Sequence, residues 1–319
     1  MENPLVSFII TDYNLPVEML RECLASITAL SLTADEREII LIDDGSAESP
    51  LAALSGFHAD ITYIRQPNGG LSAARNIGLR MAQGTYIQFV DGDDKLNRSP
   101  YEHVIDIARF SAPDMIVFEL CRTAPDDHTY ADRNVGSGCD YMRTSNIRGA
   151  ACGYLFRRAS LGELRFTIGI YHEDEEFTPQ LLLRVERVVV TDAVAYFYRL
   201  REGSIVTSDN ESNIQKRLDD TREVIVRLHT LCDTLSVPDR QAMQRRVAQL
   251  TMDYIYNVIR LLRSRELLDI RIGELRRLGL FPLPDRDYTA KYKLFRRLSA
   301  SSHGLSLLRR IVPVFDKWR

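Results

Sequence analysis

The first half of the chain alternates short apolar runs with longer segments in which apolar residues recur every three or four positions. The short runs, rich in β-branched and aromatic residues, are typical of strands and cover residues 6–11, 38–42, 61–64, 86–90 and 115–120. The longer segments predict helices, one between Val17 and Ile27 with Asn14 as its candidate cap, and one over residues 71–82. Strands that alternate with helices indicate βαβ units, so we expect an α/β fold with a mostly parallel central sheet flanked by helices.

The pattern changes after about two-thirds of the chain. Apolar residues such as Leu218 and Ile225 then keep helical spacing, few strand signals occur, and an interruption is expected near Pro282. The sequence therefore predicts two domains, an α/β domain over residues 1–210 and an α-helical C-terminal extension over residues 211–319.

Polar segments directly follow three of the predicted strands, at Thr11–Asn14, Asp43–Ser46 and Asp91–Asp94. Ligands of parallel sheets bind beyond the carboxyl ends of the strands, so we expect these segments to face one crevice. The three aspartates between positions 91 and 94 repel one another when ionised. A bound cation would relieve this repulsion, but so would water around an acidic surface turn, and the cluster alone does not decide between them.

Composition narrows the class of protein. With 319 residues, 45% of them hydrophobic and 27% charged, the chain is globular in composition. Five cysteines with no CxxC pair favour a reduced, cytosolic protein over a disulfide framework or a structural zinc site. The N-terminus lacks the basic start of a signal peptide, and no apolar run is long enough to span a bilayer. We therefore expect a cytoplasmic protein, soluble or peripheral at the inner face of the membrane.

Three common motifs can be excluded. The first predicted strand is followed by TDYNLPVE, without the GxGxxG of dinucleotide-binding proteins, and the chain has no GxxxxGK[ST] phosphate loop. An EF-hand loop that starts at Asp91 would have Lys95 at its fifth position and Leu96 where the sharp turn needs glycine.

A family resemblance emerges from the order of the remaining motifs. The chain contains, in this order, SFIITDYN, EIILIDDGS, NGGLSAARNIGLRMAQGTYIQFVDGDD, HEDEEF and YFYRLREGSI. Together they resemble bacterial family-two glycosyltransferases of the GT-A fold, over about residues 5–206. The resemblance implies that residues 1–210 form a GT-A catalytic domain, a nucleotide-diphospho-sugar transferase fold, that binds a nucleotide-sugar donor.

The resemblance also implies roles for the residues of the first two motifs. Asp44, with Asp43, would read the nucleotide base, and Thr11 and Tyr13 would line the same pocket. The family commonly has proline where this chain has Thr11, and a small or apolar residue where it has Asp12, so the details of the base pocket differ here.

For the later motifs the resemblance implies a metal site and a base. Asp91-Gly92-Asp93 would be the DxD-like motif, in which Asp93 binds Mn²⁺ or Mg²⁺ and Asp91 lies near the ribose or a metal-bound water. Arg75 would lie beside the nucleotide. Asp174, paired with Glu173, would be the catalytic base.

The chemistry asks for the same residue types. A departing nucleoside diphosphate develops negative charge that a hard divalent cation held by carboxylates stabilises, and an acceptor hydroxyl needs one base for an inverting displacement. Alternatives stay open: Arg75 also suits a helix surface, His172 more often packs than binds metal, and Asp174 competes with the neighbouring glutamates for the role of base. Arg199, Arg201 and Ser204 either close over the pyrophosphate or form a solvated basic turn.

The expected function is therefore metal-dependent, inverting transfer of a sugar from a nucleoside diphosphate, with UDP-sugar as the expected donor, to a hydroxyl of a glycan or lipid-linked acceptor in surface polysaccharide synthesis. A glycoside hydrolase with paired carboxylates and a nucleotide-sugar binding module without turnover are the alternatives. The resemblance places acceptor recognition in the variable stretch of residues 125–169.

The C-terminal tail is basic although the whole chain has a net charge of −3. Residues 256–319 hold fifteen Lys or Arg against six Asp or Glu, an excess of nine positive charges, so the remainder carries −12. Cations interleaved with apolar residues suit contact with an anionic membrane, but equally a helix packed on the protein itself or on a homodimer partner. Nucleic acid is not expected as a partner, because the chain as a whole is slightly acidic.

Overall fold

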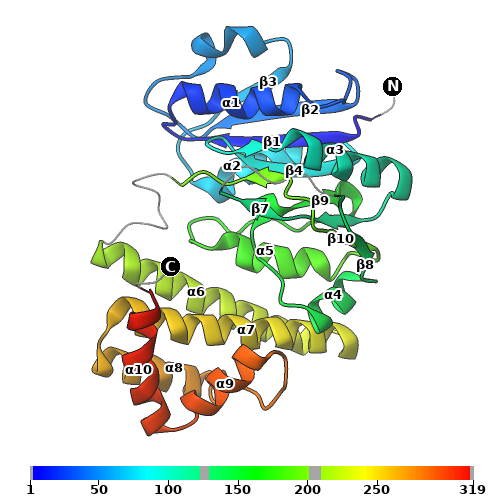
Figure 1. The fold of residues 1–319 in the computed structure, drawn as a ribbon. Coiled ribbons are helices and arrows are strands. Elements are labelled where there is room, and N and C mark those ends of the chain that lie inside the picture. Colours follow the sequence, from blue (N-terminus) through cyan, green and yellow to red (C-terminus); the bar gives the residue numbers. More distant parts are fainter. Residues whose placement is uncertain (1–2, 123–128, 201–209, 317–319) are drawn as a thin grey trace. The chain divides into compact units, whose positions relative to one another are not determined.

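The computed structural model describes residues 3–122, 129–200 and 210–316 (Figure 1). Its residues separate into two compact units. The first contains Met1–Tyr141, Arg148–Gly169 and Glu173–Glu202, and the second contains Met142–Ile147, Ile170–His172 and Gly203–Arg319. A division at residue 210 thus leaves out two short segments that belong to the second unit.

The first unit is built on a sheet with eight strands among the described residues, in the order β3-β2-β1-β4-β9-β6-β10-β8. Neighbouring strands are parallel from β3 to β4 and between β6 and β10. Strand β9 is antiparallel to its neighbours β4 and β6, and β8 is antiparallel to β10. The α/β prediction is confirmed, with a sheet that is mixed rather than mostly parallel along its whole width. The strands of this sheet are β1 (Val6–Asp12), β2 (Arg37–Asp43), β3 (Ile61–Arg65), β4 (Tyr86–Asp91), β6 (Met115–Val117), β8 (Asp132–Asn134), β9 (Tyr154–Arg157) and β10 (Val188–Thr191).

Helices cover both faces of this sheet, and β1 is therefore buried on both sides. Phe8 and Ile10 belong to the apolar cluster that also contains residues of α1 and α3. Ile9 points to the opposite face, where Gly78 of α2 approaches so closely that an added Cβ would lie 2.2 Å from Ile9 Cγ2. Alternate residues of one apolar strand therefore pack against different helices. The helices of this unit are α1 (Val17–Thr28), α2 (Leu71–Met81), α3 (Arg98–Asp106) and α5 (Glu173–Leu182), and α4 (Gly138–Thr144) crosses into the second unit.

Two local predictions were wrong. Asn14 does not cap α1, which follows Pro16 and has no side-chain cap. Asn14 instead adopts a left-handed φ of 51°, and its Oδ1 accepts a hydrogen bond of 2.8 Å from the Ala47 N–H, so it fastens the end of β1 to the turn after β2. The single strand expected over residues 115–120 is divided between β6 and β7 (Leu120–Cys121). Strand β7 belongs to a small sheet, in which β11 (Tyr196–Phe197) pairs with β7 on one side and with β5 (Lys95–Leu96) on the other.

The second unit is helical, as expected from the spacing of its apolar residues. Helices α6 and α7 pack along each other, and α10 packs on α7 and α9 (Figure 1). Side chains of Ser236, Ser264 and Thr289 cap the N-termini of α7, α8 and α9. The helices are α6 (Glu211–Leu231), α7 (Val237–Leu262), α8 (Arg265–Arg277), α9 (Ala290–Ser299) and α10 (Ser302–Asp316).

Two further observations concern the predicted class of protein. All five cysteines are free thiols. Within residues 3–122, 129–200 and 210–316, no helix combines the length and the apolar character that crossing a bilayer requires.

Candidate active site

The carboxyl ends of β1, β2 and β4 meet at one edge of the large sheet. The strand register places Thr11 beside Asp91 and Asp12 beside Asp43. Backbone hydrogen bonds extend the contact, since Gly92 N donates to Thr11 O at 3.1 Å and Asp44 N donates to Asp12 O at 2.8 Å. Three segments that are distant in sequence therefore form one rim.

Gly92 is needed for close packing at this rim. An added Cβ would lie 2.8 Å from Leu15 Cδ1, from Leu20 Cδ2 and from Thr11 O, so a larger residue would push the acidic turn away from β1. Thr11 is largely buried beside it, whereas Tyr13 is 51% exposed. An exposed aromatic ring at the end of β1 offers a face on which a nucleotide base can stack.

Asp43 is fully buried and is bonded by protein donors. Its carboxylate accepts 2.7 Å hydrogen bonds from the Ser46 N–H and the Tyr63 hydroxyl, and Arg65 lies 3.4 Å away. Burial alone would raise the pKa of Asp43, but these hydrogen bonds and the charge of Arg65 outweigh it and lower that pKa. Asp43 therefore holds the turn after β2 in its ionised form.

Asp44 organises the loop before α2. Its Oδ1 accepts hydrogen bonds from the Gly69 N–H at 2.9 Å and from the Gln66 side chain. Its Oδ2 accepts from the Gly70 N–H at 2.8 Å and from Asn68 Nδ2 at 3.1 Å. The DDGS and NGG motifs, which the sequence offers separately, are thus one structural element joined by this carboxylate.

Arg75 in α2 joins the two acidic motifs. Its Nη2 donates to Asp91 Oδ1 at 3.0 Å, and its Nη1 donates to Glu173 Oε1 at 2.8 Å. Asp91 is the last residue of β4 and Glu173 is the first residue of α5. A single guanidinium therefore brings the DGDD turn and the start of α5 together at one site of this unit.

Arg75 is 4% exposed, and its side chain is held from several directions. Its guanidinium carbon lies 5.7 Å from the ring centroid of Phe89 and 5.4 Å from that of Phe166. Burial alone would lower the pKa of Arg75, but the negative charges of Asp91 and Glu173 raise it above its ordinary value. The arginine is therefore a fixed cation at the centre of the site.

Asp94 is the buried aspartate of the acidic turn and stabilises it through hydrogen bonds. It is 1% exposed and accepts hydrogen bonds from the Tyr196 hydroxyl at 2.8 Å and the Arg199 N–H at 2.7 Å. The Tyr196 hydroxyl in turn accepts a 3.0 Å hydrogen bond from the Asp91 N–H. Burial, with the nearby charge of Asp91, raises the pKa of Asp94 to about 8. Sequence reasoning missed Tyr196, because no spacing rule links it to an aspartate 102 positions earlier.

The start of α5 carries four consecutive acids, and their surroundings differ. Glu173 and Glu176 are buried, and Glu173 is bonded by Arg75. Burial raises the pKa of Glu173, and Arg75 opposes that rise. Asp174 and Glu175 are half-buried, and the negative charge of Asp174 acts on Arg75. A base that must reach an acceptor hydroxyl needs an accessible carboxylate, which favours Asp174 over Glu173.

The cationic segment after β11 is described only in part. The Arg199 guanidinium donates to Glu22 of α1 at 2.6 Å. Arg201 and Ser204 lie outside the described residues. His172, which directly precedes α5, has a left-handed φ of 61°.

The acidic turn suits a divalent cation only as a shared site. Within the part of the chain that the structure describes, no three His, Cys, Asp or Glu side chains are placed to hold a metal by themselves. Mg²⁺, however, is commonly held by one or two carboxylates together with substrate phosphates and water. Asp93 and Asp91, both partly exposed, are a donor set of that kind.

Comparisons with known proteins agree with this geometry. The family model described as glycosyl transferase family 2 matches residues 7–165. EpsJ of Bacillus subtilis, itself named an uncharacterized glycosyltransferase, is 31% identical over 219 residues. That alignment covers 63% of this chain and 63% of EpsJ, so the chain matches less than two-thirds of that relative's length.

Solved structures are similar over nearly the whole chain. Residues 1–349 of TarS from S. aureus, solved in complex with UDP-GlcNAc, give a TM-score of 0.71 at 18% identity and cover 98% of this chain and 92% of that one. The mannosyltransferase PcManGT from Pyrobaculum calidifontis, solved with GDP-Man and Mn²⁺, gives 0.58 at 15% identity, with coverages of 99% and 88%. Through residues 7–165 the chain therefore belongs to glycosyl transferase family 2, and its fold is of the GT-A type, as the sequence predicts.

Proposed function

We propose that the protein transfers a sugar from a nucleoside diphosphate, a UDP-sugar, to a hydroxyl of a glycan or lipid-linked acceptor, with inversion at the anomeric carbon. In this proposal residues 1–210 are the catalytic domain and residues 211–319 an extension. The observation that carries the proposal is the Arg75 bridge between Asp91 and Glu173, because it holds a diphosphate-binding turn and a candidate base at one site.

Asp174 takes the proton of the acceptor hydroxyl, and the resulting nucleophile attacks the anomeric carbon of the donor from the face opposite the leaving group. The C–O bond to the nucleoside diphosphate breaks as the new glycosidic bond forms. Glu173 stays paired with Arg75 and orients the first turn of α5. One base is enough because the reaction is a single displacement.

In this proposal the donor binds at the rim formed by the carboxyl ends of β1, β2 and β4. Tyr13 and Thr11, with Asp44 and Asp43 behind them, form the base pocket, and Arg75 lies near the nucleotide. The nucleotide-binding role expected of Arg201 stays a prediction from the sequence, because that residue lies outside the described ranges. Asp93 and Asp91 would hold Mn²⁺ or Mg²⁺, which when bound neutralises charge on the leaving diphosphate. The Mn²⁺ complex of PcManGT and the UDP-GlcNAc complex of TarS support this choice of ligands.

The assignment of the base is tested by replacing the four acids of α5 one at a time, in the variants Glu173→Gln, Asp174→Asn, Glu175→Gln and Glu176→Gln. Asp174→Asn should lower transfer by roughly 10²–10⁴-fold while donor binding is kept, because only the proton acceptor is lost. Glu175→Gln is the matched control and should retain transfer. Full activity of Asp174→Asn would contradict the assignment, and release of free sugar without an acceptor would favour hydrolysis.

The donor site is tested by thermal shift with UDP, GDP and their Mn²⁺ complexes. A ligand that binds only the folded protein raises the melting temperature, so selective stabilisation by UDP with Mn²⁺ is expected. Asp93→Ala should remove the Mn²⁺-dependent part of that shift. An identical shift in the variant would show that Asp93 is not a metal ligand.

We also propose that the basic tail rests on an anionic membrane surface, at the cytoplasmic face. The apolar side of α9 is buried through Tyr292 and Phe295, so only single apolar side chains such as Leu294, 61% exposed, remain available. Lys291 and Arg297 flank it and are exposed. Contact would therefore be mainly electrostatic and sensitive to salt.

Pelleting with liposomes that contain phosphatidylglycerol tests the membrane proposal. Lys291→Glu with Arg297→Glu should reduce the pelleted fraction, whereas Arg80→Glu with Arg98→Glu, at exposed residues outside the tail, changes the net charge equally and should not. Equal pelleting of both pairs would contradict the proposal. Light scattering in the same buffer reports whether the tail instead joins a homodimer.

A further inference from the structure

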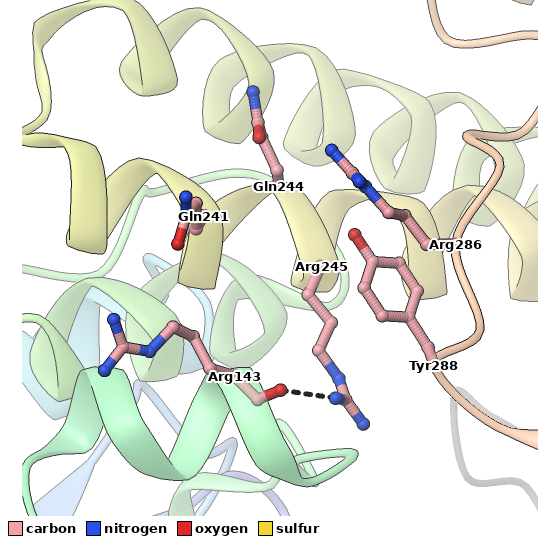
Figure 2. A pocket seen from close by; sticks show the side chains of 6 residues that line it. All are labelled: Arg143, Gln241, Gln244, Arg245, Arg286 and Tyr288. Atoms are coloured by element: carbon pink, nitrogen blue, oxygen red, sulfur yellow. Dashed lines mark hydrogen bonds between the residues drawn. The ribbon is translucent and has the colours of Figure 1, made fainter.

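A pocket in the second unit has a cationic lining that the proposed chemistry does not use (Figure 2). Its volume is about 320 Å³, at the lower end of the range for ligand pockets. No acid is among the residues that line it in the described part of the chain, and the lining residues are Arg143, Gln241, Gln244, Arg245, Arg286 and Tyr288.

Arg245 is the unusual member of this lining. It is 7% exposed, yet its contacts within the described residues are all neutral. Its guanidinium donates to the backbone oxygen of Arg143 and to Asn146 Oδ1 at 3.3 Å, it lies 5.1 Å from the Tyr288 ring centroid, and its Nε has no hydrogen-bond partner. Burial lowers the pKa of Arg245. A buried cation without a carboxylate is unfavourable, and an anionic ligand would relieve this.

The acids nearest in sequence are engaged elsewhere. Asp285 and Asp287 flank Arg286 in the loop before α9, but Asp285 pairs with Arg296 at 2.6 Å and Asp287 pairs with Lys293 at 2.9 Å. These ion pairs turn the negative side chains toward α9. The loop thereby presents Arg286 and Tyr288 to the pocket and withholds its acids from it.

The cations surround the pocket and do not converge on one point. Figure 2 shows the Arg245 guanidinium directed toward the backbone of Arg143, the Arg286 guanidinium beside the Tyr288 hydroxyl, and the Arg143 side chain directed away from both. Separated cations suit a ligand with more than one negative group. The amides of Gln241 and Gln244 lie on the same wall and can both donate and accept, which suits sugar hydroxyls.

We propose that this pocket binds an anionic glycan segment that carries repeated phosphate or carboxylate groups. Arg245 and Arg286 bind the negative groups, and Gln241 and Gln244 bind the hydroxyls between them. The choice of a glycan as the ligand rests on the proposed function, and the proposal gives that function an acceptor class, a negatively charged chain.

The test is a binding titration at constant ionic strength with the full-length Asp174→Asn variant, so that no turnover interferes. The probes are a glycerol phosphate hexamer, hexagalacturonate, neutral maltohexaose and a six-nucleotide thymidine oligomer. At least one of the two anionic glycans should bind roughly tenfold tighter than maltohexaose. The phosphate and carboxylate probes identify which negative group the pocket prefers.

Variants locate the binding. Arg286 is exposed, so Arg286→Gln leaves the core intact and should weaken the preferred probe by roughly fivefold or more. Arg245→Gln should do the same, because it removes the other cation assigned to the negative groups. Arg277→Gln with Arg310→Gln removes two exposed charges of the same unit and should have no such effect.

Three results would overturn the proposal: equal binding of neutral and anionic glycans, an unchanged affinity in Arg286→Gln, or equally tight binding of the thymidine oligomer. The proposed function is judged separately, by transfer to neutral and to anionic glycan acceptors with wild-type protein. Transfer with no anionic preference defeats only this inference, whereas no transfer by protein that binds both donor and anionic glycan defeats the proposed function.

Discussion

Two buried arginines, one in each unit, show how differently a protein can treat the same side chain. Arg75 is 4% exposed and Arg245 is 7% exposed. Arg75 meets two carboxylates, from Asp91 and Glu173, whereas the contacts of Arg245 in the described residues are neutral. Accordingly the pKa of Arg75 is raised by its acidic neighbours and that of Arg245 is lowered by burial.

The difference indicates different roles: Arg75 holds the candidate active site together, whereas Arg245 is proposed to bind a ligand. Because the charge of Arg75 is already balanced, its contribution is to fix two acidic elements relative to each other. The charge of Arg245 is not balanced by any acid among the residues that line the pocket. The free energy of the folded protein should therefore fall when an anion binds there. Substitutions should therefore affect the two arginines in different ways.

The largest effect on stability is expected at Arg75. Arg75→Met leaves Glu173 and Asp91 without their cation, and breaking a buried ion pair in this way costs about 3–5 kcal/mol. Urea unfolding at pH 7 measures the loss. Adding Glu173→Gln to Arg75→Met removes one orphaned charge and should restore part of the stability.

Arg80→Met is the matched control, since Arg80 lies on the same helix and is exposed. Its unfolding free energy should remain within about 0.5 kcal/mol of the wild type. If the Arg75 and Arg80 variants behaved alike, the ion pairs of Arg75 would not stabilise the unit, and the first half of the comparison would fail.

A smaller effect, with a definite pH dependence, is expected at Asp12. Burial, with the charge of Asp43, raises its pKa from 3.8 to about 6. The folded protein then holds the Asp12 proton more tightly than the unfolded chain, so this contribution is complete below about pH 4 and is lost as the pH rises through 6.

Asp12→Asn keeps an acceptor for the Leu15 N–H but cannot ionise. The variant should be about 1–2 kcal/mol more stable than the wild type at pH 7, with a flatter profile between pH 4 and 7. Urea unfolding at several pH values measures this, and Asp35→Asn, an exposed aspartate, is the control. A profile as steep as that of the wild type would show that Asp12 is already well solvated or paired.

At Arg245 the comparison predicts a near-neutral result. Arg245→Met removes a buried charge without leaving an orphaned acid, and replacing buried ions with apolar residues is often neutral or stabilising. The unfolding free energy should change by no more than about 1 kcal/mol, the net contribution of a typical hydrogen bond, although the variant loses the bonds to the Arg143 carbonyl and to Asn146 Oδ1. A loss as large as that of Arg75→Met, measured in the same urea series, would mean that Arg245 has a structural role equal to that of Arg75.

The fold can be predicted from the sequence more fully than the hydrogen bonds and ion pairs within the candidate site. Periodicity locates β1, β2, β3 and β4 to within one residue at each end, because these strands are continuous apolar runs closed by turn residues. It misses β8, β9 and β10, which are three or four residues long and follow no alternation that separates them from loops. Their pairing is decided by tertiary contacts.

The candidate site shows the same division. Asp91, Asp93 and Asp174 are visible as motif residues, because their chemistry is local to a short stretch of chain. The bridge from Arg75 to Glu173 spans 98 positions and the bond from Tyr196 to Asp94 spans 102, so no spacing rule indicates either. Arg245 gave no signal, since its exceptional feature is the absence of an acid among neighbours that only the fold assembles.

The smallest effect is expected where an arginine is half-buried and already paired with an exposed acid. Arg199 pairs with Glu22 at 2.6 Å, and half of the Glu22 side chain is exposed, so solvent screens the pair. Glu22→Gln should lower the unfolding free energy by no more than about 0.5 kcal/mol, and high salt should abolish the difference. A loss above 1 kcal/mol that survives salt would mean that this pair is shielded from water. The pair of Arg199 and Glu22 would then be balanced in the same way as the buried ion pairs of Arg75. Burial of the charge would therefore no longer distinguish Arg75 and Arg245 from the arginines at the surface.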